Sequence, residues 1–339
     1  MTPTRRDFTA LTLTLALGLA GPARAFARQA LVIARGGAVG DVSEGTRGAY
    51  EMAIRDGADF IAATFMPSKD GALVAIADPE LSVATDVASR PPFADRRQAR
   101  EIDGPARLGW FVHDFTLAEL KTLARTAPAG ARRHGRAGDD TGHAILTFEE
   151  MLSIAQAGSA RTARVVGVHA TMGHPGYFAG LDLAIEPRLA GAIRVGGYNA
   201  PAAAMFVASD DPEALKTIGE LTRARRVLRL AGENLAALAP EGLKTLGATV
   251  EAVAVDPGAL LDLAAPKAIA PTPVTADAHA AGLAVQAWLP AEFPPPPLRP
   301  GDARRALAAL YAAGVDGVAG DLAAPIARAR GDALPSQRD

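Results

Sequence analysis

Short apolar segments alternate with helix-like segments along most of the chain, and this alternation limits the possible folds more than any other feature. Segments 31–35 (LVIAR) and 60–66 (FIAATFM) have the length and apolar character of buried parallel strands. Repeated strand-then-helix units imply parallel strands joined by right-handed crossovers. About eight such units predict an α/β fold, a TIM-type (β/α)8 barrel. A doubly wound open sheet is the alternative, but no glycine-rich nucleotide-binding turn favours it.

The other expected elements continue the same order. Strands are expected at 73–77, 164–170, 204–208, 226–230, 250–255, 284–288 and 315–319. Helices are expected at 44–56, 117–124, 148–157, 183–195, 212–221, 258–263, 276–281 and 303–313. Residues 79–145 interrupt the alternation with Pro91-Pro92 and a stretch rich in Gly, Arg and Asp. They predict a large insertion after the second strand.

The expected organisation is a leader at 1–27, a single barrel domain at 28–330 and a short tail at 331–339. The formal net charge of −2 gives no electrostatic reason to expect a nucleic-acid partner. The chain has no cysteine, which excludes disulfides, thiol catalysis and zinc–thiolate sites.

The N-terminus predicts export. Arg5-Arg6 precede an apolar run at 10–20, and Ala23-Arg24-Ala25 follows it with small residues suited to cleavage. This pattern resembles a twin-arginine signal and predicts a periplasmic or secreted protein. An ordinary secretory signal and a retained N-terminal anchor are the alternatives. The run is too short to be a lasting membrane anchor, and no other segment is long and apolar enough to cross a bilayer.

The motifs along the chain, taken in order, resemble those of the glycerophosphodiester phosphodiesterases. The first segment reads VIARGGAVGDVSEGT at 32–46, against a family pattern of roughly V-I-A-H-R-G-A-x-G-x-x-P-E-x-T. The further matches are EGTRGAYEMAI at 44–54, GADFI at 57–61, SKDG at 68–71, TDV at 85–87, FTLAELK at 115–121, TFEE at 147–150, DPEAL at 211–215 and GVDGV at 314–318. The resemblance extends from residue 31 to about 329 and implies a periplasmic-type phosphodiesterase barrel with an insertion.

The same resemblance shows that the catalytic positions have changed. Family members use two histidines, an arginine, a lysine and three carboxylates that hold Ca²⁺ or Mg²⁺. In this chain the catalytic positions carry Arg35, Gly36, Ala77 and Gly173, and the metal-ligand positions carry Ala62, Thr64 and Thr171. Losing these groups removes the acid/base and metal contributions to the reaction. The resemblance therefore predicts an inactive family member with no metal cofactor.

Four residues are expected to form a pocket at the barrel mouth: Arg35, Glu44, His169 and Trp288. Arg35 offers a forked set of donors to an anion, or it pairs with a local carboxylate such as Glu44. His169 is either a satisfied interior histidine or a catalytic one. Trp288 lines a ligand cavity or covers the core. His174 is expected in a loop, and His113, His134, His143 and His279 lack the spacing of metal ligands.

Three functions remain open from the sequence. The first is an exported pseudoenzyme that binds a small anionic or phosphorylated ligand at the mouth. The second is an active phosphodiesterase with rearranged groups, for example Arg35 with His169 or with a histidine of the insertion. The third is a structural partner protein, for which an exposed apolar patch would be expected.

Overall fold

The computed structural model describes residues 29–38, 44–126, 144–263, 269–294 and 298–333. Within these ranges the main sheet has the order β1-β13-β12-β9-β8-β7-β6-β2, and it closes because β1 also pairs with β2. All these strands pair in parallel, so they form the (β/α)8 barrel that the sequence predicted. The barrel strands are β1 (Leu31–Arg35), β2 (Phe60–Pro67), β6 (Gly167–Met172), β7 (Met205–Ser209), β8 (Arg225–Leu230), β9 (Ala252–Val255), β12 (Ala284–Trp288) and β13 (Gly317–Gly320).

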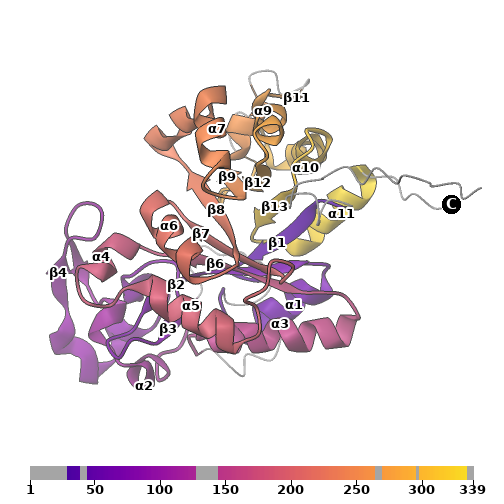
Figure 1. Cartoon of the computed structure of the whole chain (residues 1–339). Coiled ribbons are helices and arrows are strands. Elements are labelled where there is room, and N and C mark those ends of the chain that lie inside the picture. Colours follow the sequence, from indigo (N-terminus) through magenta and orange to yellow (C-terminus); the bar gives the residue numbers. More distant parts are fainter. Residues whose placement is uncertain (1–28, 39–43, 127–143, 264–268, 295–297, 334–339) are drawn as a thin grey trace, which may run out of the picture.

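Helices surround the strands on the outside (Figure 1). The α-helices in the described residues are α1 (Arg47–Arg55), α2 (Leu117–Leu120), α3 (Phe148–Thr162), α4 (Pro175–Ala179), α5 (Ile185–Val195), α6 (Pro212–Leu221), α7 (Pro240–Gly247), α8 (Pro257–Leu260), α9 (Val274–Ala280), α10 (Ala303–Ala312) and α11 (Ala323–Ala333). Local chemistry explains where the crossover helices begin. Thr147 and Glu150 form a capping box at α3, and Asp211 caps α6 with Pro212 at its first position.

The insertion follows β3 (Leu73–Ala75), which pairs antiparallel with β2 and lies outside the barrel. Its described part, up to residue 126, contains short 3-10 turns, the hairpin β4 (Gln98–Arg100) with β5 (Arg107–Gly109), and α2. In Figure 1 this part lies beside β3 and α4 at one end of the molecule. Two further short strands of the described residues, β10 (Leu261–Asp262) and β11 (Ala270–Pro271), pair with each other in antiparallel fashion. The expected leader, and His134 and His143, lie outside those residues.

The barrel interior is a separate, mostly small-residue core. Its members include Ile33, Phe60, Ala62, Phe206 and Val227, and they alternate with residues that face the helices. The larger core lies between strands and helices. No helix in the described ranges is long and apolar enough to cross a membrane.

Candidate functional site at the barrel mouth

The barrel mouth lies at the carboxyl ends of the parallel strands, where the family-like positions come together. Thr64 of β2 pairs in register with Thr171 of β6, two residues beyond the Ala62–His169 pair, so these side chains share the inward face. A cavity of about 450 Å³ opens here, and the residues that line it include Thr64, Ala77, Thr171, Gly173, His174 and Arg229. The structure thus brings together positions that are far apart in the sequence.

Arg35 is fixed by an ion pair across the seam between the first and last strands. Its Nε donates to Oδ1 of Asp321 at 2.7 Å, and both side chains are partly exposed. Its guanidinium also lies 5.8 Å from the centroid of the Trp288 ring, a cation–π contact. The expected pairing with a local carboxylate is therefore made with Asp321, which follows β13, rather than with Glu44.

A second arginine, Arg229 of β8, approaches the same tryptophan. Its guanidinium lies 5.0 Å from the centroid of the Trp288 ring. Burial lowers the pKa of Arg229, Asp210 opposes this shift, and Arg35 adds to it through charge repulsion. The described residues contain no hydrogen bond or ion pair between Arg229 and Asp210. Because Arg229 also lines the cavity, the mouth presents two guanidinium groups around one indole.

His169 lies below Trp288, in the middle of the barrel, and is fully buried. Its ring packs between Trp288 and Phe206, with centroid distances of 5.4 Å and 5.7 Å. Its Nε2 donates to Oε1 of Gln286 at 3.1 Å, since that oxygen can only accept. Burial lowers the pKa of His169 to about 4, and the charge of Arg229 acts in the same direction. A histidine that is neutral and fully buried fits the role of a hydrogen-bonded interior residue better than that of a catalytic residue.

Glu44 fills the space beside Gly36, where the family pattern has an arginine. A Cβ atom at Gly36 would lie 2.5 Å from Cγ of Glu44, and the backbone φ of +63° there also favours glycine. Burial raises the pKa of Glu44, while Arg125 and Arg35 lower it and Asp321 raises it. Arg125 comes from the insertion, is almost fully buried, and donates to the carbonyl of Ala75. The insertion therefore supplies a guanidinium to the carboxylate at this corner of the mouth.

Among the histidines of the described residues, His174 is the one that lines the mouth cavity. Its Nδ1 lies 2.7 Å from Oδ2 of Asp103, an insertion residue, so the two form a histidine–carboxylate pair. His174 has the left-handed φ of +51°, which is uncommon for a residue other than glycine. His113 is instead buried, and its Nε2 lies within hydrogen-bond distance of the Tyr177 hydroxyl, at 3.2 Å.

The residues at the metal-ligand positions do not match a Ca²⁺ or Mg²⁺ site. Ala62 offers no oxygen, and Thr64 and Thr171 offer neutral hydroxyls where a hard cation prefers carboxylates. Within the ranges that the structure describes, no group of three or more His, Cys, Asp or Glu side chains could hold a metal ion.

The four residues that the sequence predicts for a pocket, Arg35, Glu44, His169 and Trp288, lie near one another but are not among the residues that line the 450 Å³ cavity. Arg35 contacts Trp288, Trp288 contacts His169, and Glu44 lies within electrostatic reach of Arg35. Sequence reasoning missed Arg229 and the His174–Asp103 pair. Period-two alternation along β8 was the available signal, because it places Arg229 on the face of the interior residue Val227 at the carboxyl end of the strand.

Comparisons with known proteins agree with this architecture. Residues 36–323 match the glycerophosphoryl diester phosphodiesterase family. A glycerophosphodiester phosphodiesterase of Arabidopsis thaliana is 39% identical over 146 residues, which are 42% of this chain and 37% of the relative. One of Haemophilus influenzae is 28% identical over 166 residues, 46% of this chain and 43% of the relative. The matched segments thus span less than half the length of these two curated relatives.

Solved structures show the same fold at low identity. A phosphodiesterase of Oleispira antarctica, in complex with the product sn-glycerol-3-phosphate, is 19% identical with a TM-score of 0.60, covering 89% of this chain and 96% of that one. A glycerophosphodiester phosphodiesterase of Agrobacterium tumefaciens is 17% identical with a TM-score of 0.58, covering 88% of this chain and 99% of that one.

Proposed function

The chain belongs to the glycerophosphoryl diester phosphodiesterase family, and we propose that it binds a small phosphate-bearing anion at its barrel mouth without hydrolysing phosphodiesters by the metal-dependent route of that family. The observation that carries the proposal is the convergence of Arg35 and Arg229 on Trp288. Two guanidinium groups at the mouth provide forked, charge-assisted donors for phosphate oxygens. Three aspartates, Asp103, Asp210 and Asp211, also line the cavity, so phosphate binding without a cation depends on the two arginines to offset their charge.

The absence of catalytic groups supports the second half of the proposal. Arg35 and Ala77 occupy the two histidine positions, and a general acid or base contributes roughly 10²–10⁴ in rate. Ala62, Thr64 and Thr171 lack the carboxylates that would hold a cation, so the charge stabilisation supplied by a metal is lost as well. His169 is sealed below Trp288 and does not replace either histidine.

A second candidate function is supported by His174 and Asp103. A histidine oriented by a carboxylate is a recognised general base, and this one lies at the rim of the mouth cavity together with Arg229. A metal-independent phosphodiesterase would use His174 to activate water and Arg229 to stabilise the phosphorane charge. Asp103 is largely exposed, which weakens its hold on the imidazole, so we rank this candidate below binding alone.

We place this function in the periplasm or outside the cell, on the basis of the twin-arginine-like leader. The leader lies outside the described residues, and its support comes from Arg5, Arg6 and the apolar run that follows them.

The deciding experiment measures turnover and binding on the same mature protein. Glycerophosphocholine is supplied with Ca²⁺, with Mg²⁺ and with chelator, and release of glycerol 3-phosphate is followed beside an active family member. Calorimetry measures the affinity for glycerol 3-phosphate. Binding without turnover supports the proposal. Metal-dependent turnover overturns it, and chelator-resistant turnover that His174→Ala abolishes establishes the second candidate. No binding and no turnover favours a structural partner protein.

A further inference from the structure

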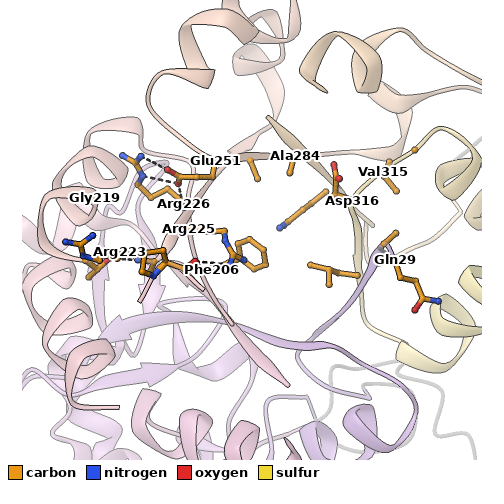
Figure 2. A pocket seen from close by; sticks show the side chains of 18 of the residues that line it. Gln29, Phe206, Gly219, Arg223, Arg225, Arg226, Glu251, Ala284, Val315 and Asp316 are labelled. Carbon is orange, nitrogen blue, oxygen red and sulfur yellow. Dashed lines mark hydrogen bonds and ion pairs between the residues drawn. The ribbon is translucent and has the colours of Figure 1, made fainter. Parts of the chain in front are cut away.

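A second cavity, of about 380 Å³, lies at the opposite end of the barrel from the mouth. It is formed where the strands begin, by residues that include Leu31 of β1, Ala252 of β9 and Ala284 of β12. Its volume falls within the usual range for small-molecule sites. Figure 2 shows side chains from several strands facing this space.

Apolar groups form most of the walls, and Phe206 forms part of the inner end. Leu31, Ala252, Ala284 and Val315 surround the opening together with Tyr311. Phe206 packs on its far side against His169, so aromatic rings close the cavity toward the barrel centre. A ligand here would therefore bury an apolar body against a closed floor.

The charged groups of the cavity give it a net positive charge. Three arginines and two carboxylates line it: Arg223, Arg225, Arg226, Glu251 and Asp316. Glu251 is held by Arg226 through a 2.7 Å ion pair, visible in Figure 2. Asp316 accepts from the backbone of Val285 at 2.7 Å and pairs with His279 at 2.8 Å. Both carboxylates thus already have cationic or N–H partners.

Arg225 brings positive charge to the inner part of the cavity. Its guanidinium lies 5.4 Å from the centroid of the Phe206 ring and donates to the Pro201 carbonyl at 3.1 Å. Figure 2 shows it beside Phe206. Gln286 also lines the cavity; its Oε1 accepts from His169, which directs the amide protons of Nε2 to other acceptors.

From these features we infer that the N-terminal end of the barrel holds a second ligand site, which takes a small amphipathic carboxylate. The carboxylate meets Arg225 and the Gln286 amide, and the apolar body lies between Leu31, Ala284 and Val315. This site is separate from the phosphate-binding mouth, because His169 and its neighbouring rings fill the barrel between the two.

The test uses two probes of matched shape, 2-naphthoate and its neutral analogue 2-naphthamide, with calorimetry on the mature protein. Naphthoate should bind with a dissociation constant below about 1 mM, and Arg225→Gln should weaken it about tenfold or more while changing naphthamide binding less than about twofold. Ala284→Phe fills the cavity without touching the charge and should abolish binding of both probes. Arg229→Gln, at the other end of the barrel, is the matched control and should leave naphthoate binding unchanged.

Several results would overturn the inference. Equal affinity for the two probes, or no naphthoate binding at millimolar concentration, would contradict it. So would naphthoate binding that survives both Arg225→Gln and Ala284→Phe, or naphthoate binding that is lost in Arg229→Gln. Thermal midpoints of the variants within a few degrees of the parent protein show that lost binding is not lost folding.

Discussion

The guanidinium of Arg229 lies 5.0 Å from the centre of the Trp288 ring, so a cation from the fifth barrel strand rests on an aromatic side chain from the seventh. Arg35 reaches the same ring from the first strand but is also held by Asp321. The two arginines should therefore contribute unequally to anion binding. The positive charge of Arg35 is already partly neutralised by its ion pair with Asp321, so Arg229 is the more available of the two for an anion.

Replacing Arg229 by glutamine should weaken the binding of glycerol 3-phosphate about tenfold or more, since it removes charge-assisted hydrogen bonds. Arg35→Gln should have the smaller effect. The double variant Arg35→Gln/Asp321→Asn is the control, because the single Arg35→Gln change leaves the Asp321 carboxylate without its partner. Calorimetry on the three variants measures the difference, and a larger effect at Arg35 than at Arg229 would contradict the assignment.

Calcium and magnesium should leave the thermal midpoint unchanged. A ligand raises the midpoint only by binding the native state, and Ala62, Thr64 and Thr171 do not supply the carboxylates of a hard-cation site. Differential scanning calorimetry with millimolar Ca²⁺, millimolar Mg²⁺ or chelator checks this. A rise of several degrees with either cation would show a metal site that the residues at these positions do not indicate.

Stability should fall as the pH is lowered from about 6.5 to about 4, partly because of His169. Its folded pKa of about 4 lies below the ordinary value of 6.5, so the unfolded chain takes up the proton first in this window. The loss for this one residue is on the order of 3 kcal/mol at the acid end. Above pH 6.5, His169 is neutral in both the folded and the unfolded state, so its contribution to the free energy of unfolding no longer changes with pH.

His169→Gln isolates that effect, because glutamine stays neutral throughout. His113, whose burial also lowers its pKa to about 4, still titrates in both proteins and cancels in the comparison. Denaturant titrations at pH 7 and pH 4.5 should show a smaller loss of unfolding free energy in the variant. Equal losses in the two proteins would mean that His169 is protonated while the barrel is folded.

Arg125→Met should destabilise the fold by about 3 kcal/mol, because it removes the larger of the two cationic contributions to the partly buried Glu44 carboxylate and a buried donor to the Ala75 carbonyl. The loss should be larger at pH 8 than at pH 5, since burial raises the pKa of Glu44 and the protonated form tolerates the site better. Adding Glu44→Gln should recover part of the lost stability. If the stability changes of the two single variants add up to that of the double variant, the two side chains do not interact.

Changing Arg5 and Arg6 to lysine should leave the precursor in the cytoplasm if the leader works as a twin-arginine signal. Cell fractionation and immunoblotting measure the periplasmic yield. A normal yield from the double variant would support an ordinary secretory signal instead, and a parallel Arg24→Lys change tests whether any arginine in the leader matters.

The sequence predicts the barrel well because each strand-then-helix unit has its own local signal. The eight barrel strands lie within a few residues of their expected positions, since buried parallel strands appear as short apolar runs. Helices α4, α7 and α11 were not predicted. The α7 segment, PEGLKTLG, is too short to show a clear helical repeat, and the alanine-rich α11 segment, AAPIARARGDA, has a weak apolar stripe, so the helical state of both depends on docking against the barrel.

The candidate site could be predicted only in part, for a physical reason. Arg35, His169 and Trp288 lie in short strands whose alternation reveals the inward face. The partners of these residues come from elsewhere: Asp321 follows the last strand, while Arg125 and Asp103 belong to the insertion, which has no periodicity to align. Pairing across such distances depends on tertiary packing, which one sequence does not reveal.

The packing around Gly36 and Gly173 couples these two positions to their neighbours. A side chain at Gly36 would begin 2.5 Å from Cγ of Glu44, and one at Gly173 would begin 2.8 Å from Cγ2 of Thr64 and 2.9 Å from Cε of Met66. A larger residue at either position therefore requires these neighbours to move or to change as well. This part of the mouth can accept larger side chains only through paired substitutions, for example one at Gly36 together with one at Glu44.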